Sequence, residues 1–409
     1  MATLYRSVIQ RYSPTPAVKS MFPLFLLMVN ECVRLGLDAK ATEYEDVKRV
    51  CYSRMLEFQV DHGYRVSAIF EASNLLKKNR TDSQKVKVRP PFCHRPYVAV
   101  SVGVRLEGDR LSLPGLDTIE LTSHSLSVLR QNGVSLTSVT VTPTTCSVVY
   151  HKVVEALIPS GMMAVDVNLD NVTTFDTSGS LHSYDLSALT VIHETYRRVK
   201  SRFRRNDVRI KRRVFRKYAA IEWQRKEAIL HNVSSQVVEQ AVSRRQALVL
   251  EDLRGIREMY TRRSGSTSAY LSEMNAWPFR QLLRQFAYKA EWAGLPVHTV
   301  SPEWTSEKCS ECGGSMATPP VASRDVVCLA CGLVVDRDEN GAKNILRRGL
   351  RSWPVGSANE AMVGGQPLQR GPTPESMRTT CRVAHNDSAG GSERNRCRRS
   401  AAGMNEHAE

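Results

Sequence analysis

The chain has 409 residues, of which 42% are hydrophobic and 24% are charged. This composition is typical of globular proteins with room for two or three cores of roughly 100 to 200 residues each, and it excludes collagen-like, coiled-coil and wholly disordered chains. Lys and Arg number 57 against 41 Asp and Glu, which gives a formal net charge of +16. Such an excess predicts a polyanionic partner, with nucleic acid as the leading candidate.

The longest apolar run, Met21–Val29, is too short to span a bilayer, and the first residues lack a signal-peptide core. We therefore expect an intracellular, cytoplasmic protein associated with the nucleoid. In such a reducing compartment the ten cysteines are expected to be free thiols or metal ligands.

The first half of the chain predicts two modules. A short strand is expected at 4–10, and a Ser-Pro-Thr-Pro break ends it. Apolar residues at helical spacing then predict two or more packed helices between about residues 18 and 78. From residue 86, β-rich segments alternate with turn signals such as Glu107-Gly-Asp, which indicates a small barrel or sandwich.

The second half alternates strands with helices, which is typical of an α/β sheet. Strands are expected at 163–167, 173–175, 247–251 and 296–300, with a long basic helical region from about 186 to 244. A further helix has apolar residues at i, i+3, i+4 and i+7, namely Phe279, Leu282, Leu283 and Phe286. Residues 351–409 are polar, without apolar periodicity, and are expected to be disordered.

Two matched pairs of cysteines predict a metal site. They are Cys309, Cys312, Cys328 and Cys331, in a C-x2-C, fifteen-residue, C-x2-C arrangement. A glycine follows the second cysteine of each pair, which lets the backbone adopt positive φ and turn its N–H groups toward the sulfurs. Four protein ligands leave no open position, so we expect structural zinc, with iron or free buried thiols as the alternatives.

Three carboxylates are candidates for catalysis: Asp166 and Glu251 within or at the end of apolar strands, and Asp338 in Val335-Asp-Arg-Asp-Glu-Asn. For each acid taken alone, the simpler interpretation is a carboxylate that binds solvent or a neighbouring arginine. Together on adjacent strands, they would hold two Mg²⁺ ions about 4 Å apart for phosphodiester hydrolysis.

The run Arg197–Lys217 contains 12 Lys or Arg among 21 residues and one acid, Asp207. A charge run usually forms a solvated face, but here the acids that normally offset it are missing, which favours a groove lined by phosphates. The candidate nucleic-acid-binding residues are Arg197, Arg198, Lys200, Arg204, Arg205, Lys211, Arg212 and Arg213.

Taken in chain order, these motifs resemble the TnpB family, transposon-encoded RNA-guided nucleases related to compact type V CRISPR effectors. The resemblance is clearest over about 160–348. It implies a multidomain α+β and α/β fold with an N-terminal wedge-like β-barrel, an inserted helical bundle, and an RNase H-like (RuvC) α/β nuclease domain interrupted by the four-Cys zinc-binding insertion. In the first half, the implied boundaries are 1–12 for the first barrel strand, 13–85 for the recognition bundle and 86–160 for the rest of the barrel. The RuvC-like domain with its basic helix would span 161–305, and its last segment 335–350. Between these two parts lies the zinc-binding insertion that binds target nucleic acid, 306–334, and the disordered tail is 351–409.

The resemblance also implies roles. Asp166, Glu251 and Asp338 would be the three catalytic acids, with Arg337 and Asn340 in support. Asp338 rather than Asp336 matches the family's second Asp in D-x-D-x-N-[AG]-A, a choice that sequence physics alone does not make. The chain departs from the family at Asn168, where Gly is common, and at Gly341, where Ala is frequent.

The function implied is an RNA-guided DNA endonuclease with structural Zn and catalytic Mg, whose partners are a guide RNA and target DNA in a transposon or CRISPR-like system. A cleavage-deficient RNA-guided DNA-binding regulator is the main alternative, and the three intact acids argue against it. A DNA-strand-transferring transposase is disfavoured because none of the ten His residues forms a His-x-His pair. A zinc-ribbon transcription factor would leave the three acids unexplained.

Overall fold

The computed structural model describes residues 1–83, 89–203, 206–254, 274, 276–317 and 324–353. The chain forms two compact units. Of the described residues, one unit contains 9–125 and 138–148, and the other contains 1–8, 126–137 and those from 149 onward. Nearly all of the expected tail lies outside the described residues, as do Arg204 and Arg205.

Three helices follow the first strand, β1 (Ala2–Arg11), where two or more were expected. They are α1 (Pro16–Asp38), α2 (Tyr44–Met55) and α3 (His62–Ser83). Thr15 caps α1, since its side chain accepts a hydrogen bond from the Val18 amide at 3.4 Å, and Pro16 follows at the first helical position. By length and composition α1 could cross a membrane, but Phe25, Met28 and other residues along it are buried within the unit, as in a core helix.

The strands of this half form two sheets. One has the order β1-β7-β6-β2, with β2 (Val98–Val100), β6 (Val134–Val141) and β7 (Thr145–Val154). The other has the order β3-β4-β5, with β3 (Arg105–Glu107), β4 (Arg110–Ser112) and β5 (Ile119–Glu120), and a short helix, α4 (Ser123–Leu129), follows. Because β1 pairs with β7, the three helices are inserted in the chain between strands of one sheet.

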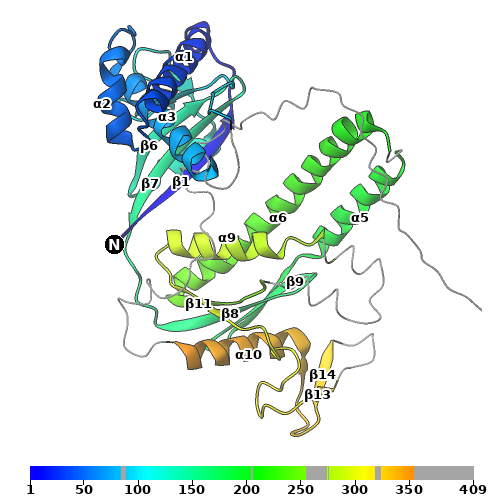
Figure 1. Cartoon of the computed structure of the whole chain (residues 1–409). Coiled ribbons are helices and arrows are strands. Elements are labelled where there is room, and N and C mark those ends of the chain that lie inside the picture. The colour runs from blue at the N-terminus through cyan, green and yellow to red at the C-terminus, as the bar shows by residue number, and fades with distance from the viewer. Residues whose placement is uncertain (84–88, 204–205, 255–273, 275, 318–323, 354–409) are drawn as a thin grey trace, which may run out of the picture. The chain divides into compact units, whose positions relative to one another are not determined.

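A mixed sheet forms the centre of the other unit (Figure 1). It has five strands in the order β10-β9-β8-β11-β12. Its strands are β8 (Gly161–Val167), β9 (Asn171–Asp176), β10 (Leu181–Asp185), β11 (Gln246–Glu251) and β12 (Val297–Val300). The strands β8, β9 and β10 pair antiparallel, whereas β8, β11 and β12 are parallel. Every residue of β11 is buried, as expected for a parallel strand with helices on both faces.

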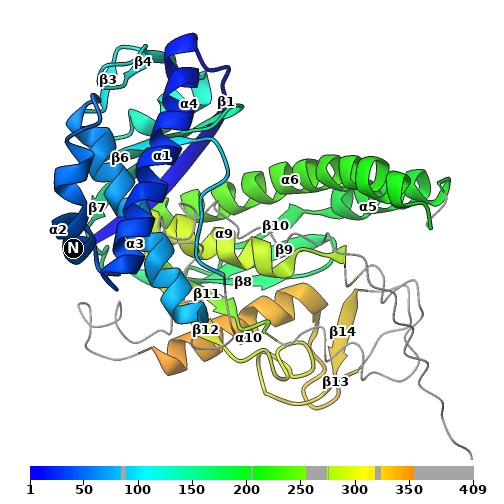
Figure 2. The ribbon, with the colours of Figure 1, turned by 45° about the horizontal axis from the view of Figure 1, so that its top comes forward.

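Helices cover both faces of this sheet (Figure 2). The helices α6 (Arg216–Ser243) and α9 (Phe279–Trp292) share one core with Val165 and Leu250. On the opposite face α10 (Arg337–Ser352) packs Ile345 against Ala164 and Val249. The prediction for the apolar stripe of α9 is confirmed, since Phe279, Leu282, Leu283 and Phe286 are all buried.

The basic region is a helical hairpin rather than one long helix (Figure 1). It consists of α5 (Ser187–Ser201), a π-helical segment (Ile210–Phe215) and α6. Asp207 explains the break, because its Oδ1 accepts hydrogen bonds from the amides of Arg209 at 2.7 Å and Ile210 at 3.3 Å, as an N-cap residue does. The one acid of the run therefore starts a new helical segment.

A small antiparallel sheet lies in the chain between β12 and α10. Its strands are β13 (Met316–Ala317), β14 (Asp325–Cys328) and β15 (Val334–Asp336). The helix α10 continues to Ser352, two residues beyond the segment that was expected to end at residue 350.

Candidate functional site

Asp166 and Glu251 lie at the carboxyl ends of two neighbouring parallel strands. In the register of β8 and β11, Leu250 is opposite Val165, so the next residue on each strand brings these two acids together. Each lies two residues after a side chain that packs beneath α10, Ala164 and Val249 respectively. Because side chains alternate along a strand, both carboxylates point to the α10 face of the sheet.

Asp338 reaches the same place from the first turn of α10. The helix starts at Asp336, whose Oδ1 accepts hydrogen bonds from the amides of Asp338 at 2.8 Å and Glu339 at 3.1 Å. One turn further on, Gly341 abuts Asp166, since a Cβ at this glycine would be 2.9 Å from Asp166 Oδ2. The structure thus brings together the three acids singled out in the sequence, and it gives Asp336 the separate task of capping the helix.

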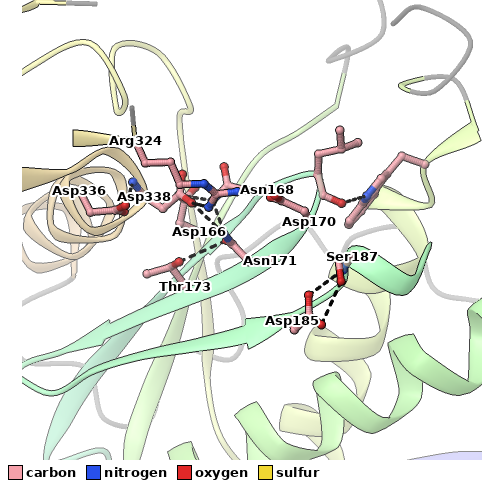
Figure 3. A network of polar contacts seen from close by, with 12 residues as sticks. Asp166, Asn168, Asp170, Asn171, Thr173, Asp185, Ser187, Arg324, Asp336 and Asp338 are labelled. Carbon is pink, nitrogen blue, oxygen red and sulfur yellow. Dashed lines mark hydrogen bonds and ion pairs between the residues drawn. The ribbon is translucent and has the colours of Figure 1, made fainter. Parts of the chain in front are cut away.

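Two asparagines connect these acids (Figure 3). Asn168 donates through Nδ2 to Asp166 Oδ2 at 2.9 Å, and Asn171 donates through Nδ2 to Asp338 Oδ2 at 2.8 Å. Asn171 is fixed in turn, because its Oδ1 accepts from Thr173 Oγ1 at 3.3 Å. Sequence reasoning missed Asn171, whose only signal was its position at the start of the strand after Asp166.

Glu251 has its own donor. The hydroxyl of Thr305 lies 2.7 Å from Glu251 Oε1, and Asn344 Nδ2 on α10 holds the carbonyl oxygen of Thr305 at 2.9 Å. Thr305 is buried, although it follows a mainly exposed loop. The sequence contained Thr305 in the Thr-Ser-Glu-Lys-Cys motif but gave no reason to link it to Glu251.

Burial raises the pKa of both strand-end carboxyls. The pKa of Asp166 rises to about 8 because the group is desolvated and lies beside Glu251 and Asp338, although Asn168 opposes the rise. Desolvation also raises the pKa of Glu251 to about 7, against the hydrogen bond from Thr305 and the charge of Arg348. Burying carboxylates side by side disfavours their charged form, and a bound cation would offset this effect. Carboxylate oxygens are also the donors that Mg²⁺ prefers.

Arg324 places a positive charge at the edge of this carboxylate site. Its Nη1 donates to Asp338 Oδ2 at 2.9 Å, and its Nη2 pairs with Asp170 (Figure 3). The residue immediately precedes β14, so it belongs to the segment between the two cysteine pairs. Sequence reasoning missed Arg324 because its partners are 154 and 14 residues away.

The four cysteines converge as their spacing predicts. Cys309 Sγ lies 3.8 Å from Cys331 Sγ, Cys312 Sγ lies 3.5 Å from Cys328 Sγ, and all four sulfurs are within 4.8 Å of one another. Four sulfurs about 2.3 Å from a tetrahedral zinc ion would be about 3.8 Å apart, so the set fits a metal ion of this type.

Both cysteine turns have the backbone expected of metal knuckles. Gly313 and Gly332 have φ of 77° and 74°, which confirms the prediction of positive φ. The amides of Gly313 and Gly332 donate to the carbonyl oxygens of Cys309 and Cys328, both at 3.0 Å. Amide hydrogen bonds from Cys331 and Ala330 lower the pKa of the Cys328 thiol to about 6, which favours the thiolate that binds metal.

The helix α10 joins the cysteine centre to the carboxylate site. Asn340 is fully buried, accepts from the Ser310 amide at 2.9 Å and donates to the Lys308 carbonyl at 2.8 Å. Arg347 adds a hydrogen bond to the Ser310 carbonyl at 2.9 Å. The support role expected of Asn340 therefore takes the form of a clamp on the first knuckle. Arg337 is exposed, and its positive charge acts on Asp166 by opposing the rise of that carboxyl's pKa.

Six of the eight candidate nucleic-acid-binding residues lie in the described part of the chain, and they differ in what they contact. Five are exposed on the hairpin: Arg197, Arg198, Lys211, Arg212 and Arg213. Lys200 instead pairs with the buried carboxylate of Glu222 at 2.8 Å. The same carboxylate also contacts His193 at 3.0 Å and Lys226 at 3.1 Å. The charge of Lys200 is thus used within the hairpin.

Comparison with known proteins places the chain in a family. It is 30% identical over 216 residues to a TnpB-like protein of Methanocaldococcus jannaschii, in a match that spans 51% of this chain and 75% of that protein. The chain belongs to the TnpB family. The model of the Cas12f1-like TNB domain also matches, over residues 279–345.

Other members and relatives of the TnpB family match over shorter shares of their length. InsQ of Escherichia coli is 29% identical over 216 residues, which is 50% of this chain and 51% of InsQ. Cas12f1 of Sulfoacidibacillus thermotolerans is 31% identical over 116 residues, which is 28% of this chain and 25% of that protein. Among solved structures, a Cas12f1–sgRNA–target DNA complex is similar with a TM-score of 0.37 and 12% identity, covering 84% of this chain and 99% of that one.

The two departures from the TnpB pattern meet at one carboxylate. Asn168, where the family commonly has Gly, donates to Asp166, and Gly341, where Ala is frequent, leaves room beside the same group. Asn168 therefore supplies a hydrogen bond to the buried Asp166, and Gly341 supplies the space that its carboxylate occupies.

Proposed function

We propose that this chain is an RNA-guided DNA endonuclease that hydrolyses phosphodiester bonds at a two-metal RuvC-like site. The observation that carries the proposal is the meeting of Asp166, Glu251 and Asp338 at one edge of the sheet. The names of relatives agree with it, since InsQ and a Streptomyces pristinaespiralis protein are named as RNA-guided DNA endonucleases. In this proposal the mixed sheet is the RNase H-like core, and the N-terminal strands and helices are the wedge-like barrel and recognition bundle.

The chemistry would come from cations held by the three carboxylates. Two Mg²⁺ ions supply, when bound, an activated water and stabilisation of the charge on the leaving 3′-oxygen. The protein's own part is to hold the donors in place: Asn171 orients Asp338, and Thr305 orients Glu251. Raised pKa values at Asp166 and Glu251 mean that deprotonation of these ligands accompanies cation binding.

The partners in this proposal are a guide RNA and target DNA. Their phosphates would contact the exposed arginines and lysine of the hairpin, in keeping with a formal charge of +16. The solved complexes that resemble this chain include one of Cas12f1 with sgRNA and target DNA. Structural zinc would hold the cysteine centre, and a cytoplasmic, nucleoid-associated location in a transposon or CRISPR-like system follows from these partners.

Two steps test the function. RNA that co-purifies with the full chain is sequenced to identify the guide, and the complex is then incubated with a plasmid library that carries the matching target beside randomised flanks. We expect cleavage in Mg²⁺ that leaves 5′-phosphate and 3′-hydroxyl ends, and none with Asp166→Asn. If wild-type protein binds its target but never cuts in Mg²⁺ or Mn²⁺, the regulator replaces the nuclease as the function of this chain.

A further inference from the structure

Trp304 combines two unfavourable features. Its side chain is 60% exposed, and its backbone has φ of 63°, in the left-handed region that a bulky side chain rarely adopts. Single exposed apolar residues are ordinary. An exposed tryptophan in a strained backbone conformation is unusual, because no burial of its side chain offsets the strain.

The other non-glycine residues with positive φ in the described part of the chain differ from Trp304. Lys40 and Arg245 each come directly after the C-cap of a helix, where a left-handed residue is common. Trp304 follows strand β12 through a turn and ends no helix. Helix termination therefore does not explain its conformation.

The strained turn is held by the Arg348 side chain and by a backbone hydrogen bond. Arg348 Nη1 on α10 donates to the Ser301 carbonyl at 2.6 Å, and its Nη2 donates to the Glu303 carbonyl. The carbonyl of Trp304 accepts from the amide of Lys308 at 3.2 Å. A conformation fixed from both sides in this way is typical of a functional position.

The location of Trp304 suggests what the indole contacts. The hydroxyl of the next residue, Thr305, donates to Glu251 at 2.7 Å, so Trp304 directly precedes the residue that orients one carboxylate of the site. Exposed Glu303 and Glu307 flank the indole in the sequence and disfavour a phosphate at this loop. An aromatic face near acids suits the uncharged face of a nucleobase rather than a backbone phosphate.

We propose that Trp304 is a stacking platform for an unpaired base of the DNA strand that enters the carboxylate site. The inference rests on the proposed nuclease function, because it assigns a contact to that site's substrate. Stacking of this kind tolerates any base and positions the neighbouring phosphodiester.

The test measures binding separately from cutting. The complex of the full chain with its guide RNA is incubated in EDTA with short single DNA strands that carry 2-aminopurine at each position in turn. Stacking on Trp304 should quench the fluorescence at one position or two adjacent ones. Trp304→Ala should abolish this quenching and weaken binding about 5- to 150-fold, whereas Trp304→Phe should keep most of both.

Trp304→Gly is the backbone control, because glycine adopts positive φ without strain. It should fold at least as stably as wild type, as judged by thermal unfolding, and yet lose stacking like the alanine variant. The proposal is overturned if Trp304→Ala or Trp304→Gly binds and quenches like wild type, if Trp304→Phe loses as much as alanine, or if the wild-type complex quenches no position of the DNA strand. A wild-type complex that stacks DNA in EDTA but does not cut it in Mg²⁺ would refute the nuclease and leave the stacking site standing.

Discussion

Asn340 Oδ1 accepts a hydrogen bond from the Ser310 amide at 2.9 Å, and this contact ties the helix that carries Asp338 to the first cysteine knuckle. Both partners are buried. The cysteine centre and the carboxylate site are therefore mechanically connected through Asn340 and Asp338 on one helix.

The first prediction follows from this contact. Asn340→Ala leaves the buried Ser310 amide without its acceptor, at a cost of about 1 to 3 kcal/mol. We expect faster loss of zinc to a chelator and a lower melting temperature. Asn340→Asp keeps the acceptor oxygen and should retain zinc better than the alanine variant, and equal release rates for all three proteins would contradict the clamp.

The second prediction separates two neighbouring acids. Asp338→Ala should abolish Mg²⁺-dependent cleavage, because it removes a carboxylate from the site. Asp336→Ala should remain measurably active, since it removes a helix cap worth about 0.5 to 2 kcal/mol. Asp336→Asn keeps a capping oxygen and serves as the control. Cleavage assays on matched target DNA decide, and an inactive Asp336→Asn would assign that residue a direct role.

The third prediction concerns pH. In EDTA, the folded protein holds protons on Asp166 and Glu251 up to about pH 8 and 7, whereas unfolded carboxyls release them near pH 4. Stability should therefore fall as the pH rises from about 4 to 8, by up to about 1.4 kcal/mol per pH unit for each group. Asp166→Asn should flatten this decline and raise stability at pH 8.

Denaturant unfolding across this pH range measures the effect. Asp109→Asn, at an exposed position of the other unit, should leave the profile unchanged. If wild type and Asp166→Asn had the same slope between pH 5 and 8, Asp166 would not have the raised pKa.

The fourth prediction distinguishes the exposed cations of the hairpin from Lys200. Replacing Arg197, Arg198, Arg212 and Arg213 with alanine should reduce the salt dependence of nucleic-acid binding by about 0.7 to 0.9 in log–log slope for each lost phosphate contact. Lys200→Ala should leave the slope nearly unchanged and lower hairpin stability, because Lys200 is engaged by Glu222. Identical slopes for wild type and the quadruple variant would show that these arginines contact solvent and not phosphates.

The fifth prediction tests how closely α10 approaches the sheet. A Cβ at Gly349 would lie 2.7 Å from Val249 Cγ2 and 2.8 Å from its Cγ1. Gly349→Ala should destabilise the fold by about 1 to 3 kcal/mol through overpacking. In a double-mutant cycle, Val249→Ala should recover part of that loss, and strictly additive effects would show that the two residues do not meet.

Sequence patterns predicted the parts of the site that depend on regular elements. The apolar runs before Asp166 and Glu251 marked two buried strands, and parallel strands place their carboxyl ends at one edge. The cysteine spacing likewise predicted its own turns. These features were predictable because each depends on a few consecutive residues and on the regular backbone geometry of a strand or a turn.

The supporting contacts were not predictable in the same way. Thr305 and Arg324 reach their carboxylates from loops whose course is set by tertiary packing, and Asn171 does so from the first residue of β9. Nothing in the local sequence of the three residues links them to the acids. The break at Asp207 was missed for another reason: a run of twelve cations suggested one continuous face, whereas a single capping residue was enough to start a new helix.

The late position of α10 in the chain affects how the protein matures on the ribosome. Ile345 and Leu346 cover the sheet face that contains Ala164 and Val249, and the same helix delivers the third acid. Until residue 337 and those after it have left the exit tunnel, that apolar face is open and the acid set is incomplete. A chain that ends before α10 therefore exposes this apolar face, which favours aggregation, and lacks the third acid of the carboxylate site.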